Sequence, residues 1–178
     1  MNPKDAVEKI RERFPEEIRE IKEHNGQISV IIRRDRVSDI LKYLHSDPFL
    51  KFDLLKDLCG VDYYKKKDPR FEVVYHIYSL QNRCLLRLRA EVPEDDCWIQ
   101  SVSDVYAGAN WPERECYDLF GIVFKGHPDL RRVLLPDDWE GYPLRKDYPL
   151  QSDLGEREWQ GYLDVIELAK KNMEFETK

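Results

Sequence analysis

Prolines recur between residues 126 and 150 too closely for any long helix or strand to form there. They occupy positions Pro128, Pro136, Pro143 and Pro149. Proline lacks a backbone N–H donor and restricts the residue before it, so this stretch is expected to follow an extended path. The stretch is nevertheless too rich in Leu, Val, Tyr and Trp to be a solvated linker. A segment of this composition is expected to lie along another surface.

A short helix is expected just before this segment. The pair Pro112-Glu113 is typical of a helix start, because proline fits the first turn and an acid there faces the positive end of the helix dipole. Tyr117 and Phe120 would then face the core, and Gly121 would end the helix.

The composition is that of an acidic globular protein. Of the 178 residues, 42% are hydrophobic and 12% aromatic, which argues against wholesale disorder. The net charge of −6 leaves no basic excess to neutralise nucleic-acid phosphates. No apolar run approaches the roughly 20 residues needed to span a bilayer. The chain begins with acids and no apolar core, so neither a secretory nor a transit peptide is expected.

The cysteines predict neither a metal site nor an iron–sulfur cluster. No Cys-x-x-Cys pair occurs, and no histidine stands beside a cysteine at zinc-ligand spacing. We therefore expect the reduced, buried thiols of a cytoplasmic protein. The residues concerned are Cys59, Cys84, Cys97 and Cys116.

The first part of the chain predicts a helix, a hairpin and a second helix. Apolar residues at helical spacing indicate the first helix near the N-terminus. Strands over residues 18–23 and 27–33 flank Asn25-Gly26, a strong hairpin signal. Asp35 is placed to cap the second helix, whose apolar stripe ends before Pro48.

The next part predicts strands followed by helices. Residues 54–62 are ambiguous between helix and strand, with a strand favoured at their end. Residues 71–80 suit a central strand, and residues 86–92 alternate as a strand with one wet face. The apolar residues of 98–106 have helical spacing, and those of 163–173 indicate a modest C-terminal helix.

This order of elements predicts an α+β fold. We expect a two-layer domain built from a helix, two strands, a helix, three strands and further helices. Three parts are expected: a core domain over residues 1–125, an extended partner-docking arm over 126–155, and a C-terminal helix or tail over 156–178.

One group of residues could perform acid–base catalysis. Glu113, Glu115 and Asp118 share a helix-sized span, and His127 is near in sequence. A stand-alone acid–base enzyme would need these groups to converge in a closed cleft. We favour a structural role, because the helix dipole already explains the acids, which would then face solvent or a partner. His127 is expected to be a turn residue whose ring binds backbone groups.

The extended arm carries the residue types enriched at the buried centres of protein interfaces, Trp, Tyr and Arg. Its acids and bases balance, which favours ion pairs with a protein surface over binding of an anionic cofactor. The alternative that the arm folds over its own domain stays open. The predicted partner-interface residues are Arg131, Arg132, Leu134, Trp139, Tyr142, Leu144, Arg145, Lys146 and Tyr148.

The run ERECYDLFGIVFKGHPDLRRVLLPDDWEGYPLRKDYPL, from Glu113 to Leu150, closely resembles the signature of a known family. This is the 30-kDa subunit family of respiratory complex I, whose bacterial members are the C subunits of the NADH:quinone oxidoreductase. The upstream runs LKDLCGVDY and FEVVYHIYSL are compatible with the α+β domain of that family.

The resemblance implies a non-catalytic subunit of the peripheral arm of a proton-translocating enzyme. Members of the family brace the neighbouring 49-kDa subunit (the D subunit), which forms the quinone pocket with the cluster-bearing B subunit; the I subunit is a further expected neighbour. The chain itself would have no catalytic residue and would bind no cofactor or metal, since FMN, iron–sulfur clusters and quinone belong to other subunits.

The same resemblance implies a place on the cytoplasmic side of the cell membrane, held there by partners. Homologous accessory subunits also occur in membrane-bound hydrogenases, the F420H2 dehydrogenase and photosynthetic ferredoxin-dependent complexes. The intact run DDWEGYPLRKDYPL favours the respiratory enzyme.

Overall fold

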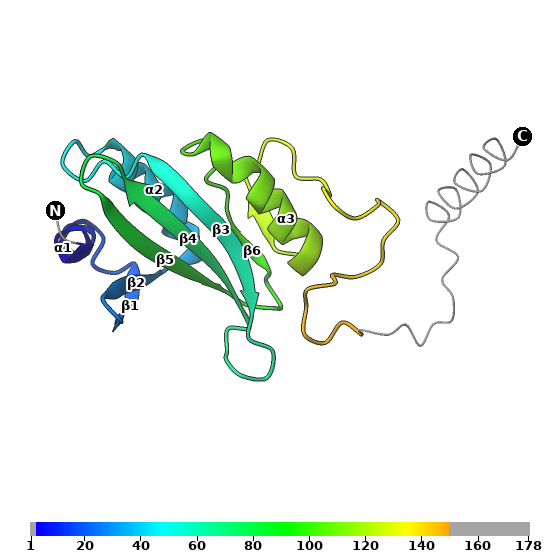
Figure 1. Cartoon of the computed structure of the whole chain (residues 1–178). Coiled ribbons are helices and arrows are strands. Elements are labelled where there is room, and N and C mark those ends of the chain that lie inside the picture. The colour runs from blue at the N-terminus through cyan, green and yellow to red at the C-terminus, as the bar shows by residue number, and fades with distance from the viewer. Residues whose placement is uncertain (1–2, 150–178) are drawn as a thin grey trace, which may run out of the picture. The chain divides into compact units, whose positions relative to one another are not determined.

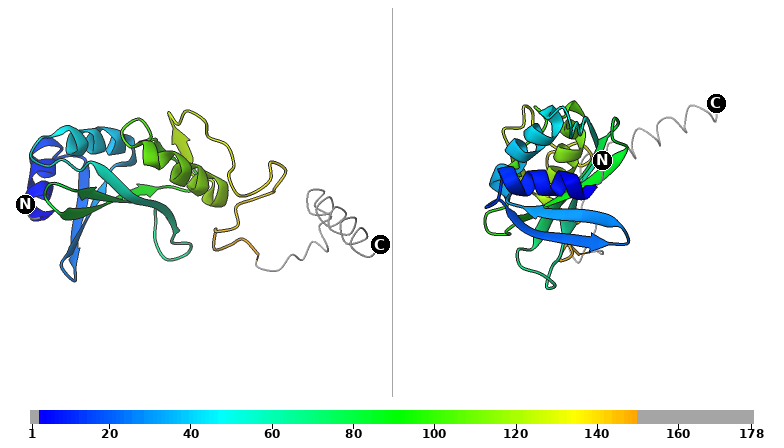
Figure 2. Two further views of the ribbon diagram at one scale, coloured as in Figure 1. Left: turned by 45° about the horizontal axis from the view of Figure 1, so that its top comes forward. Right: turned by 90° about the vertical axis from the view of Figure 1, so that its left-hand side faces the viewer.

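The structure, a computed structural model, describes residues 3–149 (Figure 1). A five-stranded sheet has the strand order β1-β2-β5-β4-β3, and the three helices lie on one of its faces (Figure 2). The helices and the sheet strands are α1 (Pro3–Arg13), β1 (Ile18–His24), β2 (Gln27–Ile32), α2 (Val37–Ser46), β3 (Leu54–Asp62), β4 (Phe71–Ser79), β5 (Cys84–Val92) and α3 (Asn110–Phe120). The short elements are two 3-10 turns, Arg34–Arg36 and Ala107–Ala109, and two strands, β6 (Trp98–Gln100) and β7 (Val123–Lys125).

Register in the sheet follows the burial of alternate side chains. Leu88 of β5 pairs with Val30 in parallel and with Tyr75 in antiparallel, and all three side chains are buried. On the opposite face, Arg89 of β5 binds the buried carboxylate of Glu72 at 2.8 Å, so this half-buried charge of β5 is paired. The α+β class and the central place of β4 are confirmed, and the ambiguous residues 54–62 form one strand.

The expected hairpin and second helix are present. Asn25 and Gly26 turn the hairpin with φ of 48° and 74°, a conformation that these residues adopt at low cost. The prediction that Asp35 caps α2 is wrong. The carboxylate of Asp35 accepts hydrogen bonds from Arg33 instead, and a 3-10 turn precedes the helix.

Residues 98–106 do not form the predicted helix. Trp98–Gln100 is a strand, β6, which pairs in parallel with β7 as a separate two-stranded sheet. Its partner Phe124 lies beyond α3, and apolar spacing within one segment cannot reveal such a distant pairing. In the same region, the Tyr106 hydroxyl donates a hydrogen bond to the Phe52 carbonyl at 2.6 Å.

Helix α3 begins and ends as the sequence predicts. Gly121 caps it in the left-handed conformation, with φ of 75°. Phe120 is buried against β3, where a Cβ added to Gly60 would lie 2.8 Å from its ring. Tyr117 is only half-buried.

Residues up to Tyr148 cluster as one compact unit, so no break occurs between residues 125 and 126. The predicted helix over 163–173, and the predicted boundary at 155, lie outside the described residues. Within residues 3–149, no helix is long and apolar enough to cross a membrane.

Candidate subunit interface

Residues 126–149, called here the C-terminal segment, contain no helix or strand. The segment runs past α3 and is held to the domain by polar contacts (Figure 1). One of these is a backbone hydrogen bond from Leu144 to the Leu119 carbonyl, at 3.1 Å. Because it forms no ladder of its own, its path depends on side chains of the domain that bind its backbone.

Asp118 is the first of these side chains and is completely buried. One carboxylate oxygen, Oδ2, accepts hydrogen bonds from the N–H groups of Val133, Leu134 and Leu135, at 3.0, 2.8 and 3.0 Å. Burial would raise the pKa of Asp118, but these N–H groups and the Arg132 guanidinium outweigh it and hold the pKa below its usual value. Asp118 therefore stays ionised and fixes a turn of the segment.

Arg132 completes this anchor. Its Nη1 lies 2.8 Å from Asp118 Oδ1, and its Nη2 donates to the Trp139 carbonyl at 3.0 Å. The carboxylate that Arg132 binds therefore belongs to α3 of the same chain. Contact of Arg132 with a partner subunit stays a prediction.

Tyr142 forms a second anchor between two guanidinium groups. Arg145 and Arg132 lie 4.6 and 5.8 Å from the centre of its ring. Arg145 also donates from Nε to the Phe120 carbonyl at 2.7 Å, which ties the segment to the end of α3. A Cβ added to Gly121 would lie 2.5 Å from the Tyr142 ring, so the close approach requires glycine there.

Arg70 is the third anchor, at the end of the sheet. It forms a two-point ion pair with Asp62, at 2.9 and 2.8 Å, and also binds Asp147 at 2.5 Å and Glu94 at 2.6 Å. Asp62 in turn accepts a hydrogen bond from the Lys146 N–H at 2.7 Å. Hydrogen bonding to Asp62, and then to Asp147, raises the pKa of Arg70. The three anchors thus attach the segment at residues 132–135, 142–145 and 146–147.

These anchors leave apolar side chains facing outward. Leu134 is 64% exposed and Leu144 is 44% exposed, although each belongs to a stretch whose backbone is fixed. Arg131 is also exposed and pairs with Asp129 at 2.9 Å. Fixed backbone with exposed leucine is an arrangement suited to docking, because little conformational entropy remains to be lost on binding.

Glu113 lies in a separate buried group on the same helix. Its carboxylate accepts hydrogen bonds from Ser101 Oγ at 2.6 Å and from the Val102 N–H at 2.7 Å. Burial raises the pKa of Glu113 to about 7, although both hydrogen bonds oppose this. The expectation that the helix acids face solvent or a partner is wrong for Glu113 and Asp118, since both are fully buried.

His127 occupies the turn that was expected of it. Nδ1 accepts the Asp129 N–H at 3.0 Å, and Nε2 lies 3.2 Å from the Asn110 carbonyl. These contacts suit the neutral ring with its proton on Nε2. The nearest carboxylate oxygen of Glu113 is 4.0 Å away from Nε2.

The four groups of the acid–base hypothesis do not converge. Glu113 and His127 lie near each other, Asp118 is enclosed by backbone N–H groups, and Glu115 is exposed. No group of three or more His, Cys, Asp or Glu side chains within residues 3–149 could hold a metal ion.

Of the nine predicted interface residues, the structure turns some inward and some outward. Arg132, Tyr142 and Arg145 contact their own domain, whereas Leu134 and Leu144 are exposed. Trp139 is half-buried, Lys146 is exposed, and Tyr148 donates a hydrogen bond to the Glu140 carbonyl at 3.2 Å.

Sequence reasoning missed the domain side of these contacts. Asp62 and Arg70 lie far from the segment in sequence, and only the folded sheet brings them to Asp147. The available signals were an acid at the end of one strand, Asp62, and an arginine just before the next strand, Arg70.

Comparison with known proteins decides the family. Residues 30–154 match the family described as respiratory-chain NADH dehydrogenase, 30 Kd subunit. The chain belongs to this family. The 30-kDa subunit family therefore supplies the context for the C-terminal segment, all of which lies inside the matched range.

Relatives of this chain within the 30-kDa subunit family match more than four fifths of its length. The NADH-quinone oxidoreductase C subunit of Geotalea uraniireducens is 52% identical over 146 residues, covering 82% of this chain and 87% of the relative. The C subunit of Geobacter metallireducens is 48% identical over 158 residues, with 89% and 96% covered. The predicted relationship to the C subunits of this enzyme is confirmed.

Solved structures agree. A trypsin-resistant fragment of Nqo5 superimposes with a TM-score of 0.62 at 34% identity, covering 73% of this chain and 100% of the fragment. A chain from the membrane-bound sulfane sulfur reductase, an archaeal respiratory membrane complex, gives a TM-score of 0.70 at 25% identity, covering 84% and 87%. The fold of this chain is thus that of subunits of respiratory complexes.

Proposed function

We propose that this chain is a non-catalytic subunit of the NADH-quinone oxidoreductase whose C-terminal segment docks on the neighbouring 49-kDa subunit. The observation that supports this most strongly is the pairing of a fixed backbone with an exposed side chain at Leu134. Three N–H groups on Asp118 hold the backbone, and the side chain is 64% exposed. Such a residue serves as an anchor for a partner pocket.

The chain's role in catalysis is then to support subunits that carry the cofactors. Glu113 and Asp118, its buried carboxylates on α3, are each occupied by hydrogen bonds from the chain itself. In this proposal FMN, iron–sulfur clusters and quinone bind to other subunits. The chain has a peripheral position on the cytoplasmic side of the membrane, with the cluster-bearing B subunit also near.

Replacement of Leu134 tests the proposal. Leu134→Ser removes an exposed apolar side chain and should leave the melting temperature of the isolated chain unchanged. It should lower the yield of the 49-kDa subunit that co-purifies with the tagged chain by about tenfold, the effect of losing one interface anchor. Leu134→Met, which keeps the apolar volume, should retain most of the 49-kDa subunit. Equal yields from the Ser and wild-type chains would contradict docking through this residue.

A further inference from the structure

A second group of exposed apolar side chains lies at the end of the domain opposite the C-terminal segment. Phe49 follows α2 and is 71% exposed, and Leu80 lies in the β4–β5 turn and is 60% exposed. The two loops that carry them are neighbours at the far end of the sheet (Figure 1). Contact of this surface with a subunit bound to the C-terminal segment would require that subunit to extend along the domain.

Hydrogen bonds join the two loops into one rigid surface. Asn82 donates from Nδ2 to the carbonyls of Phe49 and Leu50, at 2.8 and 3.0 Å. Asp47 Oδ1 accepts the N–H groups of the same two residues, at 2.8 and 3.0 Å. The exposed apolar side chains therefore stand on a backbone that is already ordered, as at Leu134.

Charges of both signs surround these side chains: the carboxylates of Asp47 and Asp53 bind backbone N–H groups of the two loops, and the Lys9 ammonium lies 4.9 Å from the centre of the Phe49 ring. Lys51 and Arg83 are exposed, and neither forms an ion pair within the described part of the chain. Both have left-handed backbone, with φ of 43° and 50°, a conformation disfavoured for residues with a Cβ. The nearby acid Asp53 is used within the domain, because its Oδ1 accepts the Leu80 N–H at 3.1 Å. Two cations are thus presented on a chain whose net charge is −6.

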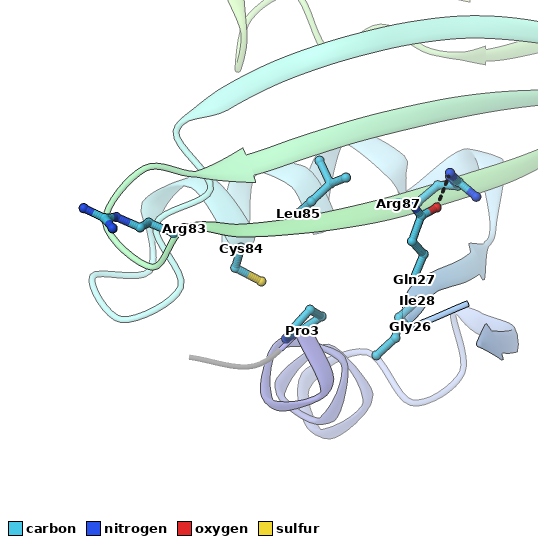
Figure 3. Close-up of a pocket in the computed structure, with 8 residues that line it drawn as sticks. All are labelled: Pro3, Gly26, Gln27, Ile28, Arg83, Cys84, Leu85 and Arg87. Atoms are coloured by element: carbon cyan, nitrogen blue, oxygen red, sulfur yellow. Dashed lines mark hydrogen bonds between the residues drawn. The ribbon is translucent and has the colours of Figure 1, made fainter. Parts of the chain in front are cut away.

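A groove of about 200 Å³ adjoins this surface (Figure 3). It lies where β2 and β5 are not yet paired, at the residues that precede the first pair, Ser29–Arg87. Pro3 of α1 faces Cys84 across it. Arg83 stands at one end, with its guanidinium directed outward. Arg83 is the residue that this groove shares with the surface around Phe49 and Leu80.

We propose that Phe49, Lys51, Leu80 and Arg83, together with the adjoining groove, form a second docking surface, and that it binds an extended acidic segment of a neighbouring protein. Apolar side chains of that segment would pack on Phe49 and Leu80. Its carboxylates would pair with the Lys51 ammonium and the Arg83 guanidinium, which have no acid partner among residues 3–149. Charge complementarity of this kind selects a partner and sets its register.

Site-specific photocrosslinking in the assembled complex tests the proposal. The variants Phe49→p-benzoylphenylalanine and Leu80→p-benzoylphenylalanine are irradiated in native membranes, and mass spectrometry identifies the crosslinked peptides. Both positions should react with one protein segment in which Asp and Glu outnumber Lys and Arg. The same probe at Lys22, an exposed site on β1, should not reach that segment.

Charge reversal supplies the second arm of the test. Lys51→Glu with Arg83→Glu should lower the crosslink yield about tenfold, since two positions of the surface then repel the partner. Lys51→Arg with Arg83→Lys should retain it. Co-purification of the 49-kDa subunit is measured on each variant, so that loss of the C-terminal contact is distinguished from loss of this one. Crosslinks to lipid, to nucleic acid or to a basic segment, or none to any protein, would overturn the proposal.

Discussion

The N–H of Leu134 lies 2.8 Å from Asp118 Oδ2, and this contact links a buried charge on α3 to an exposed leucine on the C-terminal segment. The N–H groups of Val133 and Leu135 bind the same oxygen at 3.0 Å each. A single carboxylate thus accepts the backbone hydrogen bonds of three residues, which in a sheet would be accepted by a neighbouring strand. The predictions below concern this contact and the other anchors of the segment.

Replacement of Asp118 by Asn should release the segment locally. An amide has one acceptor oxygen where the carboxylate has two, so it cannot bind both the Arg132 guanidinium and the three N–H groups. We expect stability to fall by about 1–3 kcal/mol. Hydrogen exchange of the amides of residues 133–135 should accelerate while that of β4 and β5 stays slow. Unchanged protection at 133–135 would show that Asp118 does not hold this turn.

Glu113 should make the domain less stable as the pH rises from about 4.5 to about 7. Burial raises its pKa to about 7 in the folded chain, against an ordinary value of 4.5. The unfolded chain therefore releases this proton at lower pH than the folded chain, and stability present below 4.5 is lost as the pH passes through 7. The loss should be about 1–3 kcal/mol.

Glu113→Gln should remove this part of the pH dependence while keeping the shape of the side chain. The measurement is the free energy of unfolding in urea at several pH values, compared between the two chains. Their difference isolates Glu113 from Asp118 and Asp62, whose lowered pKa values act in the opposite direction at lower pH. Parallel curves for the two chains between pH 4.5 and 7 would count against a buried, readily protonated Glu113.

Arg70→Lys should destabilise the attachment of Asp147. Lysine keeps the charge but cannot form the two-point pair with Asp62 and bind Asp147 as well. We expect a loss of about 2–4 kcal/mol, because an almost buried pair loses its geometry. Arg131→Lys is the matched control, and its exposed pair with Asp129 should matter by less than about 0.5 kcal/mol. Equal losses from the two variants in urea unfolding would contradict this account.

Gly121→Ala should weaken both the end of α3 and the Tyr142 anchor. The positive φ of 75° disfavours alanine, and the added Cβ would lie 2.5 Å from the Tyr142 ring. We expect a loss of about 1–3 kcal/mol with faster proteolysis inside residues 126–149. Gly108→Ala is the control, because a Cβ there meets nothing within 4 Å. Similar proteolysis of both variants would argue that Tyr142 does not depend on the close approach.

The sequence predicts those parts of the fold that depend on local signals. The Asn25-Gly26 hairpin, the placement of Pro112 in the first turn of α3 and the end of that helix at Gly121 each follow from backbone preferences of the residues present. The β6–β7 pair was missed because its two strands lie on either side of α3. Local periodicity contains no information on such a pairing.

The sequence predicts which residue types the candidate interface contains, but not which of its side chains face the domain and which face outward. Arginine and tyrosine in a proline-rich segment indicate contact with a surface, but Arg132 and Arg145 find that surface on their own domain. Which carboxylate an arginine binds depends on the tertiary structure. The helix dipole is enough to explain Asp118 from the sequence, whereas in the structure Asp118 is buried and binds the backbone of the segment. Leu134 and Leu144, which the sequence pattern also named as interface residues, keep exposed side chains.

Hydroxyl-radical footprinting of Leu134 and Leu144 tests the docking of the C-terminal segment most directly. The isolated chain and the assembled NADH-quinone oxidoreductase are exposed to the same radical dose, and side-chain oxidation is quantified by mass spectrometry. We predict rapid oxidation of both leucines in the isolated chain, where they are 64% and 44% exposed, and strong protection in the complex. Equal oxidation in the two samples would contradict the claim that this segment is the surface on which a partner subunit docks.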